Sequence, residues 1–225
     1  MQKRSLFIAL AAGALLWGFG ALEARAGSTT LAALIGPPAT TFTVPEVGAG
    51  GAVDTYSNFG YLTGPPGSPP LATAITVSQF GPVGNESGIT FSGGFFAPAG
   101  MTVDYFLSYT VTAPVGFKLS DATLSVVWNP FGGTGVGSVA ESLSNGASLN
   151  LVAFNNGPVT TSFAGVQSIS VQKDIELSGG SAGIGVSVIN QGFSSVPEPT
   201  SLALLGIGMT GFFAFRRFFK RTSVA

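Results

Sequence analysis

The chain has 225 residues, nine basic and ten acidic side chains, and neither cysteine nor histidine. Their absence excludes a Ser-His-Asp or Cys-His catalytic triad, a His- or Cys-ligated zinc site and a disulfide framework. Residues 27–195 hold two lysines and eight acids, a net charge of −6, which argues against nucleic acid as a partner because phosphates require Lys and Arg. We expect neither a metal nor a cofactor.

The first 26 residues have the three parts of a secretory signal peptide. Lys3 and Arg4 form a positive start, residues 6–19 are apolar, and Ala24-Arg25-Ala26 is a small-x-small cleavage site. We therefore predict export, with cleavage after Ala26. The alternative is an N-terminal anchor that is not cut.

The region from residue 27 to residue 195 shows alternating patterns typical of strands. The clearest strand is predicted at 102–113, with one apolar face and one polar face. Phe106 is the one residue of this strand that breaks the pattern. Residues 168–177 alternate in the same way, and Lys173 interrupts their apolar face, which predicts an edge strand because an inward lysine blunts aggregation there.

Shorter strands are predicted at residues 71–77, 122–128, 148–154 and 184–188. Asn145-Gly146 and Asn156-Gly157 are hairpin-type turn dipeptides, and residues 27–50 read as a lead-in without regular structure. No part of this region has a sustained helical period. We predict an all-β fold, with a single antiparallel, jelly-roll-like β-sandwich domain over residues 27–195.

The last thirty residues form a three-part tail. Val196, Pro197, Glu198 and Pro199 read as an extended segment beyond the last strand, because proline biases itself and the preceding residue away from helix. Residues 201–215 are uncharged and predict a transmembrane helix. The helix is followed by a cluster of basic residues that would stay on the cytoplasmic side: Arg216, Arg217, Lys220 and Arg221. The alternative is a buried C-terminal helix of a soluble domain.

This tail, residues 196–225, resembles the PEP-CTERM sorting signal of exported proteins in Gram-negative bacteria. The resemblance implies that the membrane enzyme exosortase cuts near Pro197-Glu198-Pro199. It also implies export across the inner membrane, a transient membrane anchor, and delivery to the cell surface or outside the cell. Because the family is associated with exopolysaccharide and biofilm producers, it implies a place in the extracellular matrix and exopolysaccharide as a partner.

Candidate ligand-binding residues are aromatic. Tyr56, Tyr61 and Trp128 could stack on the apolar faces of a neutral polysaccharide, and the alternative is that they fill the core. Asp174 and Glu176 share a predicted strand face, a spacing that permits carboxylate-based glycan hydrolysis; the alternative is a solvated face. The sequence favours a non-enzymatic surface or matrix protein with no catalytic residues. A polysaccharide-binding module is the alternative, followed by a glycan enzyme.

Overall fold

The computed structural model describes residues 27–36, 40–46, 52–64, 69–83, 86–154 and 157–219. The predicted signal peptide with Ala24 and Ala26, Asn156 of the second predicted turn, and the basic residues Lys220 and Arg221 lie outside the described residues. The elements in chain order are β1 (Ser28–Thr30), α1 (Leu31–Ile35), β2 (Phe42–Pro45), β3 (Val53–Gly64), the 3₁₀ helix η1 (Ala72–Ala74), β4 (Thr76–Val83), β5 (Glu86–Ala97), β6 (Thr102–Thr112), β7 (Phe117–Pro130), β8 (Val136–Leu143), β9 (Ser148–Val152), β10 (Val159–Val166), β11 (Ser168–Ser178), β12 (Ile184–Pro197) and α2 (Pro199–Phe219).

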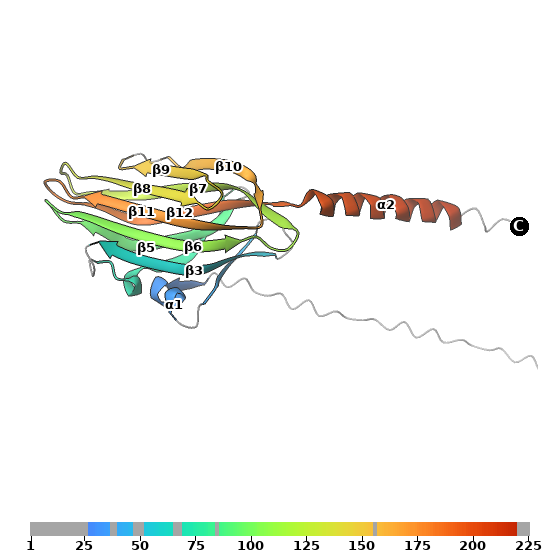
Figure 1. Cartoon of the computed structure of the whole chain (residues 1–225), viewed down its shortest axis with the longest axis horizontal. Coiled ribbons are helices and arrows are strands. Elements are labelled where there is room, and N and C mark those ends of the chain that lie inside the picture. The colour runs from blue at the N-terminus through green and yellow to red at the C-terminus, as the bar shows by residue number, and fades with distance from the viewer. Residues whose placement is uncertain are drawn as a thin grey trace, which may run out of the picture.

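The described strands form two six-stranded sheets that pack face to face (Figure 1). Sheet A has the order β1-β4-β5-β12-β7-β10, and sheet B has the order β2-β3-β6-β11-β8-β9. From β5 to β8, and again from β9 to β12, each successive strand lies in the other sheet, as in jelly-roll-like sandwiches. The predicted antiparallel β-sandwich is therefore confirmed. Figure 1 shows α2 continuing away from one end of the sandwich.

The alternation seen in the sequence sets the two faces of sheet B. In β6 the apolar set that begins with Val103 and ends with Val111 is buried, and the intervening residues face outward. In β11 the inward residues Ile169, Val171, Ile175 and Leu177 are buried in the same way. Because successive side chains of a strand point to opposite faces, both strands pack one face on the core and expose the other.

Aromatic rings cross the space between the sheets. Tyr109 of sheet B lies 5.7 Å, centroid to centroid, from Phe91 of sheet A and 6.0 Å from Tyr56, which in turn lies 6.5 Å from Phe193 of sheet A. All four side chains are buried. Tilted ring pairs at these separations add stabilisation beyond the apolar area they bury, so these rings tie the two sheets together without disulfides.

The structure corrects two expectations about the N-terminal half. Residues 71–77 are not one strand, because Ala72–Ala74 form a 3₁₀ helix and β4 begins at Thr76. The region 27–50, expected to lack regular structure, contains β1, α1 and β2. The Thr30 hydroxyl accepts a hydrogen bond from the Ala33 N–H at 3.3 Å, which caps α1 and lets its buried leucines join the core.

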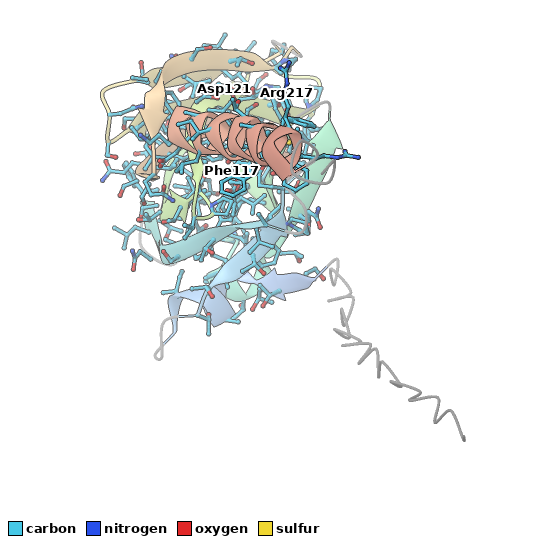
Figure 2. All side chains as sticks on the ribbon, turned by 90° about the vertical axis from the view of Figure 1, so that its right-hand side faces the viewer. Phe117, Asp121 and Arg217 are labelled. Atoms are coloured by element: carbon cyan, nitrogen blue, oxygen red, sulfur yellow. The ribbon has the colours of Figure 1, made fainter. Side chains whose placement is uncertain are left out.

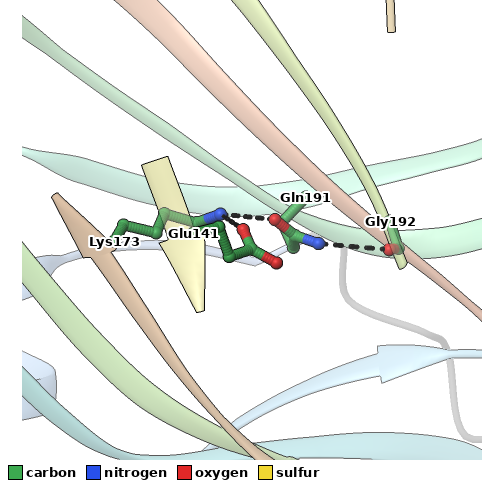
Figure 3. A network of polar contacts seen from close by, with 4 residues as sticks. All are labelled: Glu141, Lys173, Gln191 and Gly192. Carbon is green, nitrogen blue, oxygen red and sulfur yellow. Dashed lines mark hydrogen bonds and ion pairs between the residues drawn. The ribbon is translucent and has the colours of Figure 1, made fainter. Parts of the chain in front are cut away.

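The prediction of an edge strand at Lys173 is wrong. Strand β11 lies in the middle of sheet B, between β6 and β8, and the Lys173 side chain points into the core. Its ammonium group donates to Glu141 of β8 and to the Gln191 side-chain carbonyl of β12, in the opposite sheet (Figure 3). The Gln191 amide also donates to the Gly192 carbonyl at 3.5 Å. A buried charge persists here because it is paired and hydrogen-bonded.

Candidate functional site

The Pro-Glu-Pro segment (residues 196–199) is built into the end of the sandwich. Val196 pairs with Lys118 and Pro197 pairs with Phe117 of β7, and the Glu198 N–H donates to the Gly116 carbonyl at 2.8 Å. The expectation that this segment lies beyond the last strand is therefore wrong. β5 begins at Glu86, opposite Ser194, so past that point β12 is paired on one side only.

Two buried carboxyl groups lie beside the start of this segment. The Ser195 hydroxyl donates to Asp54 at 3.4 Å, and the Ser87 hydroxyl donates to Glu46 at 2.7 Å. Burial, together with the hydrogen bond and charge of Glu46, raises the pKa of Asp54 to about 9, while the Ser195 bond opposes this shift. Asp54 is thus protonated at neutral pH. Sequence reasoning missed this pair, because Glu46 directly follows β2 and Asp54 lies in β3, with no shared motif.

Helix α2 begins at Pro199, earlier than the predicted start at residue 201. Proline suits the first position of a helix, where its missing N–H would have no partner. The large apolar side chains between Leu204 and Phe215 are all exposed, and Arg216 and Arg217 occupy the last turn. Figure 2, viewed from the end where α2 leaves, shows Arg217 on this helix and Phe117 on the sandwich.

Helix α2 also bears on the predicted membrane span. Within the described residues, none of the helices has the length and apolar character needed to cross a membrane. This finding does not support the transmembrane helix predicted at residues 201–215.

The outer face of sheet B carries a groove, which we call the sheet B groove, with a volume of about 870 Å³. Two adjacent rows of cross-strand neighbours line it, and each row takes one residue from β3, β6, β11, β8 and β9 in turn. The central row is Leu62, Phe106, Asp174, Ala140 and Asn150, and the second row is Gly60, Ser108, Gln172, Ser142 and Ser148. Ile35 and Tyr61 add to one side.

Phe106 lies near the middle of this groove. Its side chain is 46% exposed although it belongs to a central strand, and its β3 neighbour Leu62 is also exposed. Two small residues lie near it: Ser108, two positions along the same strand, and Gly60, the partner of Ser108 on β3. The ring therefore stands above a shallow floor. The residue that broke the polar pattern of the sequence is the one that defines the groove.

The two acids predicted to share a strand face do share one, with Asp174 in the groove and Glu176 outside its lining. Asp174 and Glu176 both face outward from β11, and Asp104 lies directly opposite Glu176 on β6. Partial burial, and then the charge of Asp104, raises the pKa of Asp174. Lys173 also lines the groove, but its side chain is wholly buried, so only its backbone reaches the surface. The described lining thus carries negative and no accessible positive charge.

The predicted ligand-binding aromatics lie in different places. Tyr56 and Trp128 are buried, so neither has a ring face open to a ligand, and the core-packing alternative describes both. A bulge in β3, where Asn58 has φ 55°, turns both Tyr56 and Phe59 inward. Tyr61 is half-buried at the side of the groove, and its hydroxyl donates to the Pro70 carbonyl at 2.7 Å. The structure therefore brings one of the three to the groove.

The comparison with known protein families concerns the C-terminal segment of the chain. Comparison with known protein families matches residues 195–217 to the PEP-CTERM protein-sorting motif. The chain carries a PEP-CTERM sorting motif. The motif covers the last residues of β12 and α2 as far as Arg217. It implies export, processing by exosortase and sorting to the cell surface, which agrees with the resemblance seen in the sequence.

The other two comparisons concern curated proteins and solved structures. The comparison with curated proteins found no match. The solved structure of TmCBM61 in complex with β-1,4-galactotriose is similar at 13% identity and a TM-score of 0.26, covering 54% of this chain and 82% of that one. The enzymatically active domain of bacteriophage CBA120 tailspike protein 4 is similar at 13% identity and a TM-score of 0.24, covering 62% of this chain and 19% of that one. Similarities this distant carry no argument about a ligand.

Proposed function

We propose that this protein is a non-enzymatic, exosortase-sorted component of the cell surface or extracellular matrix, associated there with exopolysaccharide. The PEP-CTERM motif at residues 195–217 is the observation that carries the proposal. Exosortase cuts near Pro197-Glu198-Pro199. The exposed apolar surface of α2 associates with lipid during export, and the charges of Arg216 and Arg217 in its last turn oppose its passage through the membrane.

The available side chains favour a non-enzymatic role. The sequence has no histidine or cysteine, so a pair of carboxylates is the main remaining route to acid and base catalysis. Asp174 and Glu176 lie on an open strand face, where water reaches both, and no described group of three acids is placed to hold a metal ion. A glycan enzyme is therefore the weakest of the three functions, and unchanged reducing-end release from polysaccharide substrates would agree with that ranking.

Glu198 provides the first test. It is the only acidic residue after Glu176 in the sequence, and a carboxylate can pair with a basic group of the enzyme. Glu198→Ala should leave export intact and block processing, so that full-length protein accumulates in the inner membrane. A fractionation blot, with and without the host's exosortase, measures this. Equal processing of the two proteins would refute the role of Glu198.

The basic end provides the second test. Replacing Arg216, Arg217, Lys220 and Arg221 with serine removes the charges that oppose passage through the membrane. We expect the precursor to be released uncut. If the serine variant stayed membrane-bound and was processed normally, the basic cluster would have no part in sorting.

The sandwich itself must open before exosortase can act. Val196 and Pro197 are paired with β7, and Glu198 is hydrogen-bonded to Gly116, so these residues must leave β7 to enter an active site. The chain has no cysteine, which allows a clean cross-link test. Cysteines at Val196 and its partner Lys118 should form a disulfide in an oxidising compartment and block processing until a reductant is added.

A matched pair controls for the cross-link. Asn190 and Ser125 are also direct partners of β12 and β7, farther from the motif, and their side chains are hydrogen-bonded at 3.2 Å. Cysteines there should join the same strands without affecting processing. Equal processing of the Val196–Lys118 cross-linked protein and the wild type would show that the motif is read in its paired state.

A further inference from the structure

We propose that the sheet B groove binds a segment of neutral polysaccharide, with Phe106 as the stacking surface. The inference deepens the proposed function, because it names the part of the sandwich that would contact exopolysaccharide at the cell surface. It is carried by the groove itself, by the exposed Phe106 ring within it and by the charge of its lining.

The shape of the groove suits an extended polymer. The two rows that line it cross five adjacent strands, so the groove runs across the sheet. Leu62, Phe106 and the methyl group of Ala140 offer apolar contact in the central row, and Gly60 and Ser108 leave room beside the ring. A sugar ring has an apolar C–H face that can lie on an aromatic face while its hydroxyl edge points to polar groups.

The polar side chains are of the kinds that bind hydroxyl groups. Gln172 and Asn150 can both donate and accept, Asp174 can accept, and Ser142 and Ser148 complete the second row and its end. All five are exposed on the outer face. All five belong to β11, β8 and β9, so the hydrogen-bonding groups extend from Phe106 toward one edge of the sheet, and Leu62 of β3 lies on the other side of the ring.

The charge of the groove selects among polymers. Asp174 lies in the groove, Asp104 and Glu176 form the next row, and no accessible basic side chain is among the described lining residues. An anionic polymer such as alginate would meet repulsion here, whereas a neutral one has hydroxyl donors for the carboxylates. A second copy of the chain docked face to face would bring these acids together. Figure 1 shows the chain's own α2 leaving from the end of the sandwich, where it does not cover this face.

The floor of the groove is held in place from below. β6, β11 and β8 are interior strands of sheet B, and the side chains of Lys173 and Glu141 under the groove are paired with each other. Lys173 also reaches Gln191 of sheet A, so the floor is tied to the opposite sheet. A surface fixed before binding loses less entropy when the ligand arrives.

Binding can be tested with the full chain purified in detergent. Affinity electrophoresis through dextran, mixed-linkage β-glucan, galactomannan and xyloglucan, with alginate as the anionic comparison, measures retardation of the protein. We expect at least one neutral polymer, and not alginate, to retard it. Calorimetry with that polymer then gives the affinity of each variant.

Phe106→Ala should weaken binding at least about tenfold, as expected when a central stacking residue is truncated. Gln172→Ala should weaken it less, because other hydrogen-bonding groups remain. Phe131→Ala is the matched control, since Phe131 is 54% exposed but lies outside the groove, and it should bind as the wild type does. Unchanged thermal unfolding of Phe106→Ala would show that the loss is local.

Several outcomes would overturn the inference. These are no retardation by any neutral polymer, full binding by Phe106→Ala, equal loss in Phe131→Ala, or preferential binding of alginate. The polysaccharide assay does not depend on processing by exosortase. A negative binding result would therefore not contradict the sorting role. A negative processing result would not contradict polysaccharide binding at the groove.

Discussion

Replacing Lys173 with methionine should cost the sandwich a large part of its stability. The ammonium group is wholly buried and is bonded to Glu141 and to the Gln191 side-chain carbonyl. Methionine fills a similar volume, so the loss comes from stranding a carboxylate and an amide oxygen rather than from a cavity. Removing one partner of a buried pair costs about 3–5 kcal/mol. A small domain has only about 5–15 kcal/mol of unfolding free energy in total.

The cost should depend on pH. Burial already raises the pKa of Glu141, and Lys173 is the main group that lowers it, so the substitution raises that pKa further. The folded variant then holds a proton that the unfolded chain releases above its ordinary pKa of 4.5. Lys173→Met should therefore become more stable, relative to its own stability at pH 7, as the pH falls toward 4.5.

Denaturant unfolding of the secreted protein measures the effect. Trp128 is buried and is the only tryptophan after residue 26, so its fluorescence reports the sandwich. Lys173→Met with Glu141→Leu removes both charges and should recover most of the loss, leaving Gln191 as the remaining polar side chain. The control is Lys118→Met, at the other lysine of the domain, expected to change stability by less than about 0.5 kcal/mol. A loss below about 1 kcal/mol for Lys173→Met, or an equal loss in the double variant, would refute the reasoning.

Three further predictions concern other parts of the chain. Because the folded state holds the Asp54 proton up to a pKa of about 9 and the unfolded chain releases it from about 3.8, stability should fall as the pH rises across that window. Asp54→Asn should therefore raise the melting temperature more at pH 8 than at pH 5, and an equal rise at both would contradict the assignment. A side chain at Gly88 would place Cβ 1.8 Å from the Gln191 carbonyl oxygen, so Gly88→Ala should cost about 1–3 kcal/mol or more in denaturant unfolding. Gly208→Ala is the control: nothing lies within 4 Å of a Cβ at that position, so this substitution should not lower the stability of the sandwich. N-terminal sequencing of the exported protein should begin at Gly27, and finding Met1 there would refute cleavage after Ala26.

The sequence predicted what depends on local alternation. The strands near residues 102–113 and 168–177, and the inward and outward faces of each, follow from a period of two that the sandwich keeps. Phe106 was already visible as the apolar residue on a polar face. Its place in the groove depends on the residues that β3 and β11 bring beside it, and the order of the strands cannot be read from alternation.

What the sequence did not reveal depends on distant partners. Lys173 pairs with Glu141, 32 residues earlier, and with Gln191, 18 residues later, so its interior position appears only once the sheets are assembled. Tyr56 looked available for stacking because the bulge at Asn58 does not show in the residue pattern. Val196 and Pro197 were rightly expected to be extended, but a strand partner 78 or 80 positions away leaves no local sign.

The position of β12 links the folding of the domain to the arrival of its signal. β12 is an interior strand of sheet A, between β5 and β7, and it is also the last strand of the chain. A chain that crosses a membrane from its N-terminus therefore emerges with β5 and β7 lacking their shared neighbour, each with an open edge of unpaired backbone groups. The sheet closes only when β12 arrives, and α2 follows two residues after it ends. The strand that completes sheet A therefore also carries the first residues of the sorting motif, so closing the sheet and pairing the motif with β7 are one folding step.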